Sequence, residues 1–321
     1  MSASPAMTRP AIQNTGITTG LGLMILAMLI APLIDVFAKL ATASASPTMI
    51  TMVRFVFQGL CMLPLVIWVR SWRSFSWEMS FYHAIRAAII TISMVCFVAT
   101  LAVMPVADAV AIYFVEPIIL TVLSSIFLKE VIGWRRYTAC AVGFIGAMIV
   151  IRPSFQEIGY VALLPVVTAF CIAIFAMMTR ALAHREEPWA MQFQMSLWGI
   201  PICAILLVFG EATNVDFLAP SLPDLTTWLW MAAVGVFAAV SGILSVYAYR
   251  AAPASVLAPI HYLEIVSATL FGWLVFGDFP DPIKWIGISI IIASGLYIIW
   301  RERRVASIKP VTKSETTSVA P

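Results

Sequence analysis

Ionisable side chains inside long apolar runs are the residues of this sequence best suited to do chemistry. Arg54 stands seven residues into the second run, on one helical face with Gln58, and its planar guanidinium can bind a carboxylate or phosphate through two parallel hydrogen bonds. It can equally serve as a structural partner of Asp35 or Glu116. Asp35 and Lys39 are four residues apart near the end of the first run, a spacing that favours a local ion pair on one helix.

Two glutamates, Glu116 and Glu264, occupy the middle of later apolar runs. Tyr113 shares a helical face with Glu116, while His261 and Tyr262 shortly precede Glu264. Carboxylates in a low-dielectric surrounding can exchange protons near neutral pH, and an imidazole beside one can relay them. The alternative interpretation is that both glutamates fix helix packing through hydrogen bonds.

The composition decides what kind of protein positions these charges. Hydrophobic residues make up 62% of the 321 residues and charged residues 11%, against about 25% charged residues in a soluble domain. Such a chain cannot cover its surface with charge, which excludes a soluble enzyme, a nucleic-acid binder and a disordered protein. All five cysteines lie in apolar runs without a CxxC pair and the three histidines are far apart, so we expect no disulfide, metal or cofactor.

Apolar runs of membrane-spanning length recur along the chain. A bilayer core needs about 20 apolar residues per helix. Ten runs approach that length: 17–38, 48–69, 84–103, 107–128, 137–151, 160–183, 189–210, 226–249, 254–276 and 283–300. The sequence therefore predicts an all-α polytopic membrane protein with ten transmembrane helices. The polar ends, 1–16 and 301–321, are expected to be disordered tails.

The distribution of lysine and arginine predicts the orientation in the membrane. With a cytoplasmic N-terminus, fifteen of these residues, including Arg70, Arg73 and Arg86, fall in or beside cytoplasmic segments, and three fall outside. Because cytoplasmic loops carry the excess of positive charge, both termini are expected in the cytoplasm. The same topology makes 211–223 a periplasmic segment.

An internal repeat is the most informative pattern of the chain. Displacing the sequence by 148 residues superposes these pairs without a gap: Pro105 on Pro253, Ile112 on Ile260, Glu116 on Glu264, Thr121 on Thr269 and Glu130 on Asp278. The repeating unit, 17–152 and then 153–300, holds five predicted helices. Because five is odd, the second copy should be inserted upside down, a layout typical of secondary transporters with the substrate between the halves.

Signatures of intramembrane enzymes are missing from the sequence. We find no HExxH, GxSxG, P-loop or GxGD motif. Paired charges on a repeated frame favour a carrier over an enzyme or a scaffold that transports nothing.

Several short motifs resemble the drug/metabolite transporter superfamily, in its EamA-type family of ten-helix proteins. They are Met52-Val53-Arg54-Phe55, Met104-Pro105-Val106-Ala107-Asp108-Ala109, Val115-Glu116-Pro117, Phe127-Leu128-Lys129-Glu130 and Gly143-Phe144-Ile145-Gly146-Ala147. The similarity extends over about 17–300. The second copy departs from the family pattern, with Ile265 after Glu264 where proline is common.

The resemblance implies a carrier in the bacterial inner membrane, with two inverted five-helix halves around a central cavity, as a monomer or homodimer. The main interpretation is a transporter that moves an amino acid or related amphipathic solute by alternating access. Coupling of this transport to protons is left open. The alternative is an uptake carrier for a vitamin or nucleoside-like compound such as riboflavin or S-adenosylmethionine. The expected partners are this small molecule and the lipid bilayer, with no nucleic acid. We expect Arg54, Glu116 and the His261–Glu264 segment to line one cavity.

Overall fold

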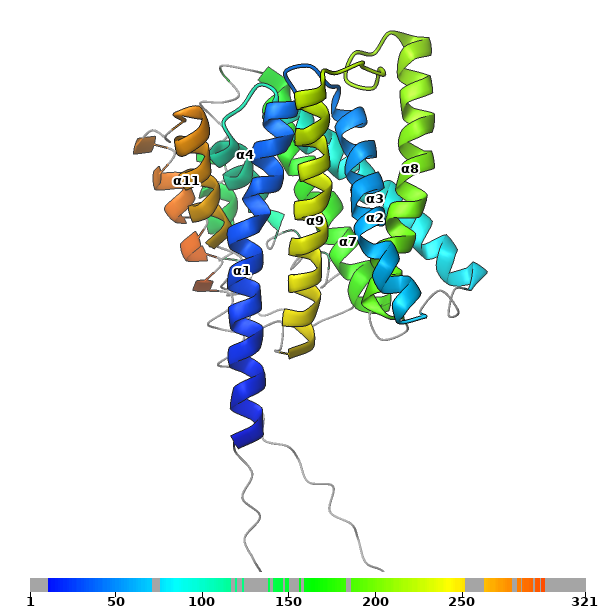
Figure 1. The fold of residues 1–321 in the computed structure, drawn as a ribbon. Coiled ribbons are helices and arrows are strands. Elements are labelled where there is room, and N and C mark those ends of the chain that lie inside the picture. Colours follow the sequence, from blue (N-terminus) through cyan, green and yellow to red (C-terminus); the bar gives the residue numbers. More distant parts are fainter. Residues whose placement is uncertain are drawn as a thin grey trace, which may run out of the picture.

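A computed structural model describes residues 11–70, 76–116, 159–182, 186–251 and 263–278, with short stretches between 119 and 156 and between 282 and 297. The described elements are all helical (Figure 1). They are α1 (Ala11–Ala41), α2 (Pro47–Trp68), α3 (Trp77–Leu101), α4 (Val106–Tyr113), the 3₁₀ helix η2 (Gly159–Leu163), α7 (Leu164–Leu182), α8 (Pro188–Thr213), α9 (Leu225–Ala251) and α11 (Leu263–Phe276).

Six of the described helices are long and apolar enough to cross a membrane. They are Thr18–Ala41, Pro47–Trp68, Trp77–Leu101, Gly159–Thr179, Trp189–Thr213 and Leu225–Ala248. This agrees with the predicted all-α polytopic membrane protein, because a chain in lipid must satisfy its backbone hydrogen bonds within each helix. The other predicted spans fall on short or partly described segments, so the number ten stays a prediction.

Helix ends follow local sequence chemistry. Ser46 caps α2 by accepting a hydrogen bond from the Met49 backbone N–H, and Pro47 takes the first helical position. Ser76 caps α3 in the same way. Asn214, with a φ of 53°, ends α8 in the left-handed conformation that asparagine tolerates. These caps place the helix boundaries at polar turn residues.

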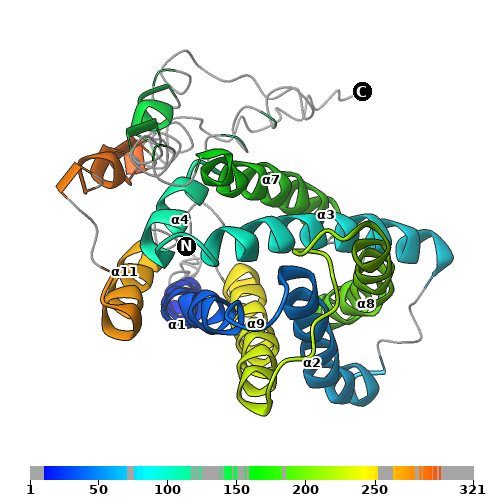
Figure 2. The same ribbon diagram turned by 90° about the horizontal axis from the view of Figure 1, so that it is seen from above.

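The helices pack in preferred pairs that both views show side by side. α1 lies along α9, α3 along α7, and α2 along α8 (Figure 2). α2 also contacts α9, α8 contacts α3, α1 contacts α11, and α7 contacts α4. A core of buried apolar side chains runs between α1, α3, α4, α9 and α11.

Hydrogen bonds tie together the helix ends at the α1–α2 turn. The hydroxyl groups of Ser44 and Thr227 are 2.7 Å apart. The Thr48 hydroxyl donates to the Phe217 carbonyl at 3.0 Å. The end of α1, the start of α2, the start of α9 and the turn that follows α8 therefore share one end of the bundle (Figure 1).

Three helices differ in their bounds from the sequence prediction. α1 begins at Ala11, inside the segment expected to be a disordered tail, directly after Pro10, which favours a helix start. α3 begins at Trp77 instead of at 84, so Arg86, counted above with the loop charges, lies inside a helix. α4 ends at Tyr113, because a proline at 117 has no N–H to donate to the Tyr113 carbonyl.

Candidate functional site

A cavity lies between α1, α2, α3, α4, α7 and α11 at mid-height in the bundle. Its volume is about 130 Å³. Polar and aromatic side chains share its wall with aliphatic ones: Ala31, Ile34, Asp35, Arg54, Ser93, Met94, Phe97, Val110, Tyr113, Thr168, Ile172 and Glu264. Both parts of the predicted repeat contribute residues, so the cavity lies between them.

Arg54 is the cation of the cavity wall, and two of its three guanidinium nitrogens have no partner among the described residues. Its Nε and Nη1 atoms are buried and have no hydrogen-bond partner among the described residues. Its guanidinium lies 5.7 Å from the centre of the Phe55 ring. Within the described part of the chain, no salt bridge joins Arg54 to Asp35 or Glu116. The structural alternative, Arg54 as a partner of Asp35 or Glu116, is thus not realised as a direct ion pair among these residues, and the two donors remain available to a ligand.

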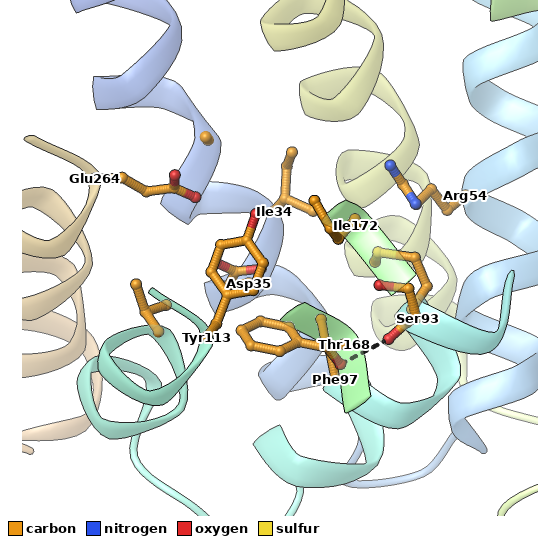
Figure 3. Close-up of a pocket in the computed structure, with 12 residues that line it drawn as sticks. Ile34, Asp35, Arg54, Ser93, Phe97, Tyr113, Thr168, Ile172 and Glu264 are labelled. Atoms are coloured by element: carbon orange, nitrogen blue, oxygen red, sulfur yellow. Dashed lines mark hydrogen bonds between the residues drawn. The ribbon is translucent and has the colours of Figure 1, made fainter. Parts of the chain in front are cut away.

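Two carboxylates, Asp35 and Glu264, face the cavity across from Arg54. Figure 3 shows Glu264 and Arg54 on opposite sides, with Tyr113 between them and Asp35 below. The formal charges of these groups leave the wall net negative. Such a wall favours a solute that brings hydrogen-bond donors or a positive charge to one end.

One backbone hydrogen bond is missing from α1 close to Asp35. Pro32 lies inside α1 and has no N–H to offer the Met28 carbonyl. The Ser267 hydroxyl of α11 donates to this carbonyl instead, at 2.9 Å. The Met28 carbonyl, which receives no hydrogen bond from Pro32, thus joins α1 to α11 near Asp35 and Glu264.

Aromatic side chains make the apolar part of the wall. The rings of Phe97 and Tyr113 have centroids 6.0 Å apart and meet at 65°, an edge-to-face pair. On the neighbouring wall, the Thr168 hydroxyl donates to the Ser93 carbonyl at 3.1 Å and joins α7 to α3. A planar ligand ring bound here would contact aromatic side chains as well as polar groups of the wall.

Lys39 does not form the expected local pair with Asp35. Its ammonium lies 2.9 Å from the Asp278 carboxylate, and 4.5 Å from the centre of the Phe276 ring. The i,i+4 spacing gives only a weak preference, and a carboxylate on a neighbouring helix offers the same charge at bonding distance. Asp35 keeps its carboxylate for the cavity.

The remaining predicted site residues lie elsewhere. Glu116 is within electrostatic range of Glu264 but does not line the cavity. The turn after Tyr113 interrupts the helical face that Tyr113 and Glu116 were expected to share. Gln58 is buried beside the cavity and not on its wall, with its side-chain carbonyl unpartnered among the described residues. His261 and Tyr262 lie outside the described residues.

The sequence reasoning missed a buried polar cluster of His83, Arg86, Thr179, Glu186 and Gln194. His83 and Arg86 lie on α3, Thr179 on α7 and Gln194 on α8, while Glu186 precedes α8. The side chains of His83 and Glu186 are 0% and 2% exposed. A histidine three residues before an arginine at the edge of an apolar run was the available signal, but Glu186 is a hundred residues away in the chain.

Comparison with known proteins identifies the family of this chain. The model of the EamA-like transporter family matches 18–152 and again 159–300. The chain belongs to the EamA-like transporter family. It is therefore a multi-pass membrane protein of the drug/metabolite transporter superfamily, whose members carry small molecules.

Individual relatives within this family are named as carriers. A riboflavin transporter of Rhizobium johnstonii is 31% identical over 222 residues, 69% of this chain and 71% of the relative. A riboflavin transporter of Vibrio cholerae is 28% identical and covers 81% of this chain and 87% of its own. An S-adenosylmethionine uptake transporter of Rickettsia bellii is 25% identical over 90% of this chain and 96% of the relative.

A solved structure shares the fold. It superposes with a TM-score of 0.59 at 14% identity and covers 91% of this chain and 99% of its own. At this identity the similarity supports only a shared arrangement of helices.

Proposed function

We propose that this protein takes up riboflavin or a closely similar planar heteroaromatic solute across the bacterial inner membrane. The observation that carries the proposal is the cavity wall, where the free donors of Arg54 lie opposite two carboxylates and beside the Phe97–Tyr113 pair. Riboflavin carries adjacent carbonyl and ring-nitrogen acceptors on a flat ring, and hydroxyl donors on its chain. Arg54 would bind the acceptors, and Asp35 and Glu264 would accept from the hydroxyls.

The names of similar proteins favour this uptake reading over the amino-acid solute expected first. Two of the relatives described above are riboflavin transporters, and they include a match at 31% identity. S-Adenosylmethionine is the second candidate, because the two cavity carboxylates suit its positive charges and relatives over 90% of the chain are named for it. Both solutes belong to the vitamin or nucleoside-like class.

Transport requires the cavity to widen. Pockets for ligands of this size measure about 300–1,000 Å³, whereas this cavity holds about 130 Å³. The proposed motion is alternating access, in which two inverted halves, 17–152 and 153–300, rock against each other. Both termini lie in the cytoplasm in this proposal.

The pattern of helix contacts supports a two-fold relation between the halves. Under the 148-residue repeat α1 corresponds to α7, α2 to α8 and α3 to α9. Exchanging the helices in this way turns the α1–α9 contact into α7–α3, and α2–α9 into α8–α3. All of these contacts occur, as a two-fold axis between the halves requires.

A growth assay tests the proposed solute. A bacterial riboflavin auxotroph without its own uptake carrier should grow on limiting riboflavin when it expresses this protein, and should not grow with Arg54→Gln. Uptake of labelled S-adenosylmethionine is measured in parallel. Absence of growth with wild-type protein present in the membrane would reject riboflavin, and uptake of the labelled compound would then select the second candidate.

A further inference from the structure

Two charged contacts join separate helices at opposite ends of the bundle. One is the Lys39–Asp278 ion pair, at the end of α1 and just after α11. The other is the buried cluster around His83, Arg86 and Glu186, at the start of α3 and just before α8. Figure 1 shows the end of α1 and the start of α3 at opposite ends of the molecule.

Donor and acceptor chemistry fixes the state of the His83 cluster. Arg86 Nη1 is a donor that lies 3.0 Å from His83 Nδ1, so this nitrogen must accept. His83 Nε2 then carries the proton and donates to Glu186 Oε2 at 2.7 Å. A neutral imidazole thus connects a guanidinium to a carboxylate, and Gln194 Nε2 donates to the same carboxylate oxygen at 3.2 Å.

The cluster also holds α7 against α3. Arg86 Nη2 donates to the Thr179 hydroxyl at 3.0 Å. The same guanidinium lies 4.7 Å from the centre of the Phe175 ring, one helical turn from Ile172 in the cavity wall. Arg86 is 2% exposed, so these interactions are shielded from solvent. Separating the helices would break them at a large cost in free energy.

The cavity lies between the two contacts along the helix axes. On α3, Arg86 precedes Ser93 of the cavity wall by seven residues, about 10 Å at 1.5 Å per residue. On α1, Lys39 follows Asp35 by four residues, toward the other end. The His83 cluster therefore lies toward one end of the bundle from the cavity, and the Lys39–Asp278 pair toward the other end.

Both contacts connect a cation of the first half to a carboxylate of the second, Lys39 to Asp278 directly and Arg86 to Glu186 through His83. Lys39 and Arg86 precede 152, whereas Asp278 and Glu186 follow 153. We propose that these contacts are the two gates of the carrier, each closing one end of the cavity and each broken when the halves rock open at that end. This inference rests on the proposed alternating-access function but not on the identity of the solute.

Side-specific labelling of a cavity residue tests the gates. Ser93 lines the cavity and its hydroxyl has no partner among the described residues, so Ser93→Cys is a small change. A membrane-impermeant maleimide is added to vesicles of either orientation, and mass spectrometry quantifies the adduct at position 93. Because no solute is added, a failure of riboflavin transport leaves this experiment intact.

Removing one gate should raise the labelling rate from one side of the membrane, and removing the other gate should raise it from the opposite side. Lys39→Met or Asp278→Asn should raise the labelling rate roughly tenfold from the Lys39 side, because the state open to that side is normally a minor one. Glu186→Ala or His83→Ala should raise it by a similar factor from the His83 side. The charge swap of Lys39→Asp with Asp278→Lys should restore the parent rate, because the ion pair forms again.

Matched controls separate gating from general loosening. Glu187→Gln removes the exposed carboxylate next to Glu186 and should leave labelling unchanged on both sides. The proposal is overturned if the two sets of gate variants raise labelling from the same side, or if folded variants of both gates label at the parent rate. If Glu186→Ala does not fold, His83→Ala and the Lys39–Asp278 swap still decide the question.

Discussion

At the residue scale, the charges inside the membrane separate into those with partners and those without. Lys39 has Asp278 at 2.9 Å. Arg54 lines the cavity, and its Nε and Nη1 have no partner in the part of the chain that the structure describes. Leaving buried donors unpaired costs about 1–3 kcal/mol per group, and a ligand that supplies the acceptors recovers this energy. The unpaired groups are therefore the ones to expect in solute binding.

Glu116 and Glu264 give a prediction about coupling. Replacing either with glutamine keeps its shape and removes its titratable charge. If protons move through these groups, Glu116→Gln should abolish uptake driven by a pH gradient in liposomes while solute exchange stays largely intact. Gradient-driven uptake at the wild-type rate in both Glu116→Gln and Glu264→Gln would limit the two glutamates to packing.

At the element scale, close helix approach holds Arg54 in place. A Cβ on Gly235 of α9 would lie 2.5 Å from the Phe57 Cβ and 2.8 Å from the Arg54 carbonyl oxygen. A Cβ at position 235 would clash with α2 at such distances, and the clash could be relieved only by moving α2 away from α9. The glycine thus sets the position of the helix that carries the arginine.

Gly235→Ala should accordingly destabilise the protein. Overpacking of this kind costs about 1–3 kcal/mol, and the midpoint of thermal unfolding in detergent should fall. Gly22→Ala is the matched control, because a Cβ on Gly22 of α1 meets nothing within 4 Å. An unchanged midpoint in Gly235→Ala would mean that the two helices are less closely packed than the structure has them.

The Asp224 cap of α9 predicts a pH dependence. Its carboxylate accepts from the Thr227 hydroxyl at 2.6 Å and from the Thr227 N–H at 3.3 Å, and these bonds lower the pKa of Asp224. A lowered folded-state pKa stabilises the protein above the unfolded value of about 3.9, and this is lost as the pH falls through the folded value. Asp224→Ala should therefore lower the unfolding midpoint at pH 7 and lose its effect in acid.

Asp216→Ala is the control for that experiment, because Asp216 is an exposed carboxylate of the same loop. A difference between wild type and Asp224→Ala that stays constant from neutral pH to pH values well below about 3.9 would show that the carboxylate charge plays no part in the cap.

At the scale of the whole molecule, the physics of the bilayer determined what the sequence could predict. Spans are visible because lipid demands long apolar helices. Arg54, Asp35 and Glu264 stood out because an intramembrane charge is rare and costly. The family follows from motifs spread over the chain. These features are local, so a single sequence contains them.

What remained hidden depends on contacts between distant segments. The partner of Lys39 is 239 positions away, and the i,i+4 neighbour Asp35 was the wrong choice. The His83 cluster needs Glu186 from a loop beside another helix. The interruption after Tyr113 shows the same limit, because Pro117 was visible in the sequence while its effect on the helical face was underestimated. Pairings of this kind are set by packing and not by spacing.

The central claim, that the cavity around Arg54 is the site of transport, is tested most directly by counterflow in proteoliposomes. Vesicles loaded with unlabelled riboflavin should accumulate labelled riboflavin through the wild-type protein. Arg54→Gln should reduce the rate about tenfold or more, because a hydrogen bond to a charged group contributes about 1.5–3 kcal/mol, and Asp35→Asn should reduce it as well, both with unchanged unfolding midpoints. Wild-type rates in both variants would contradict the account.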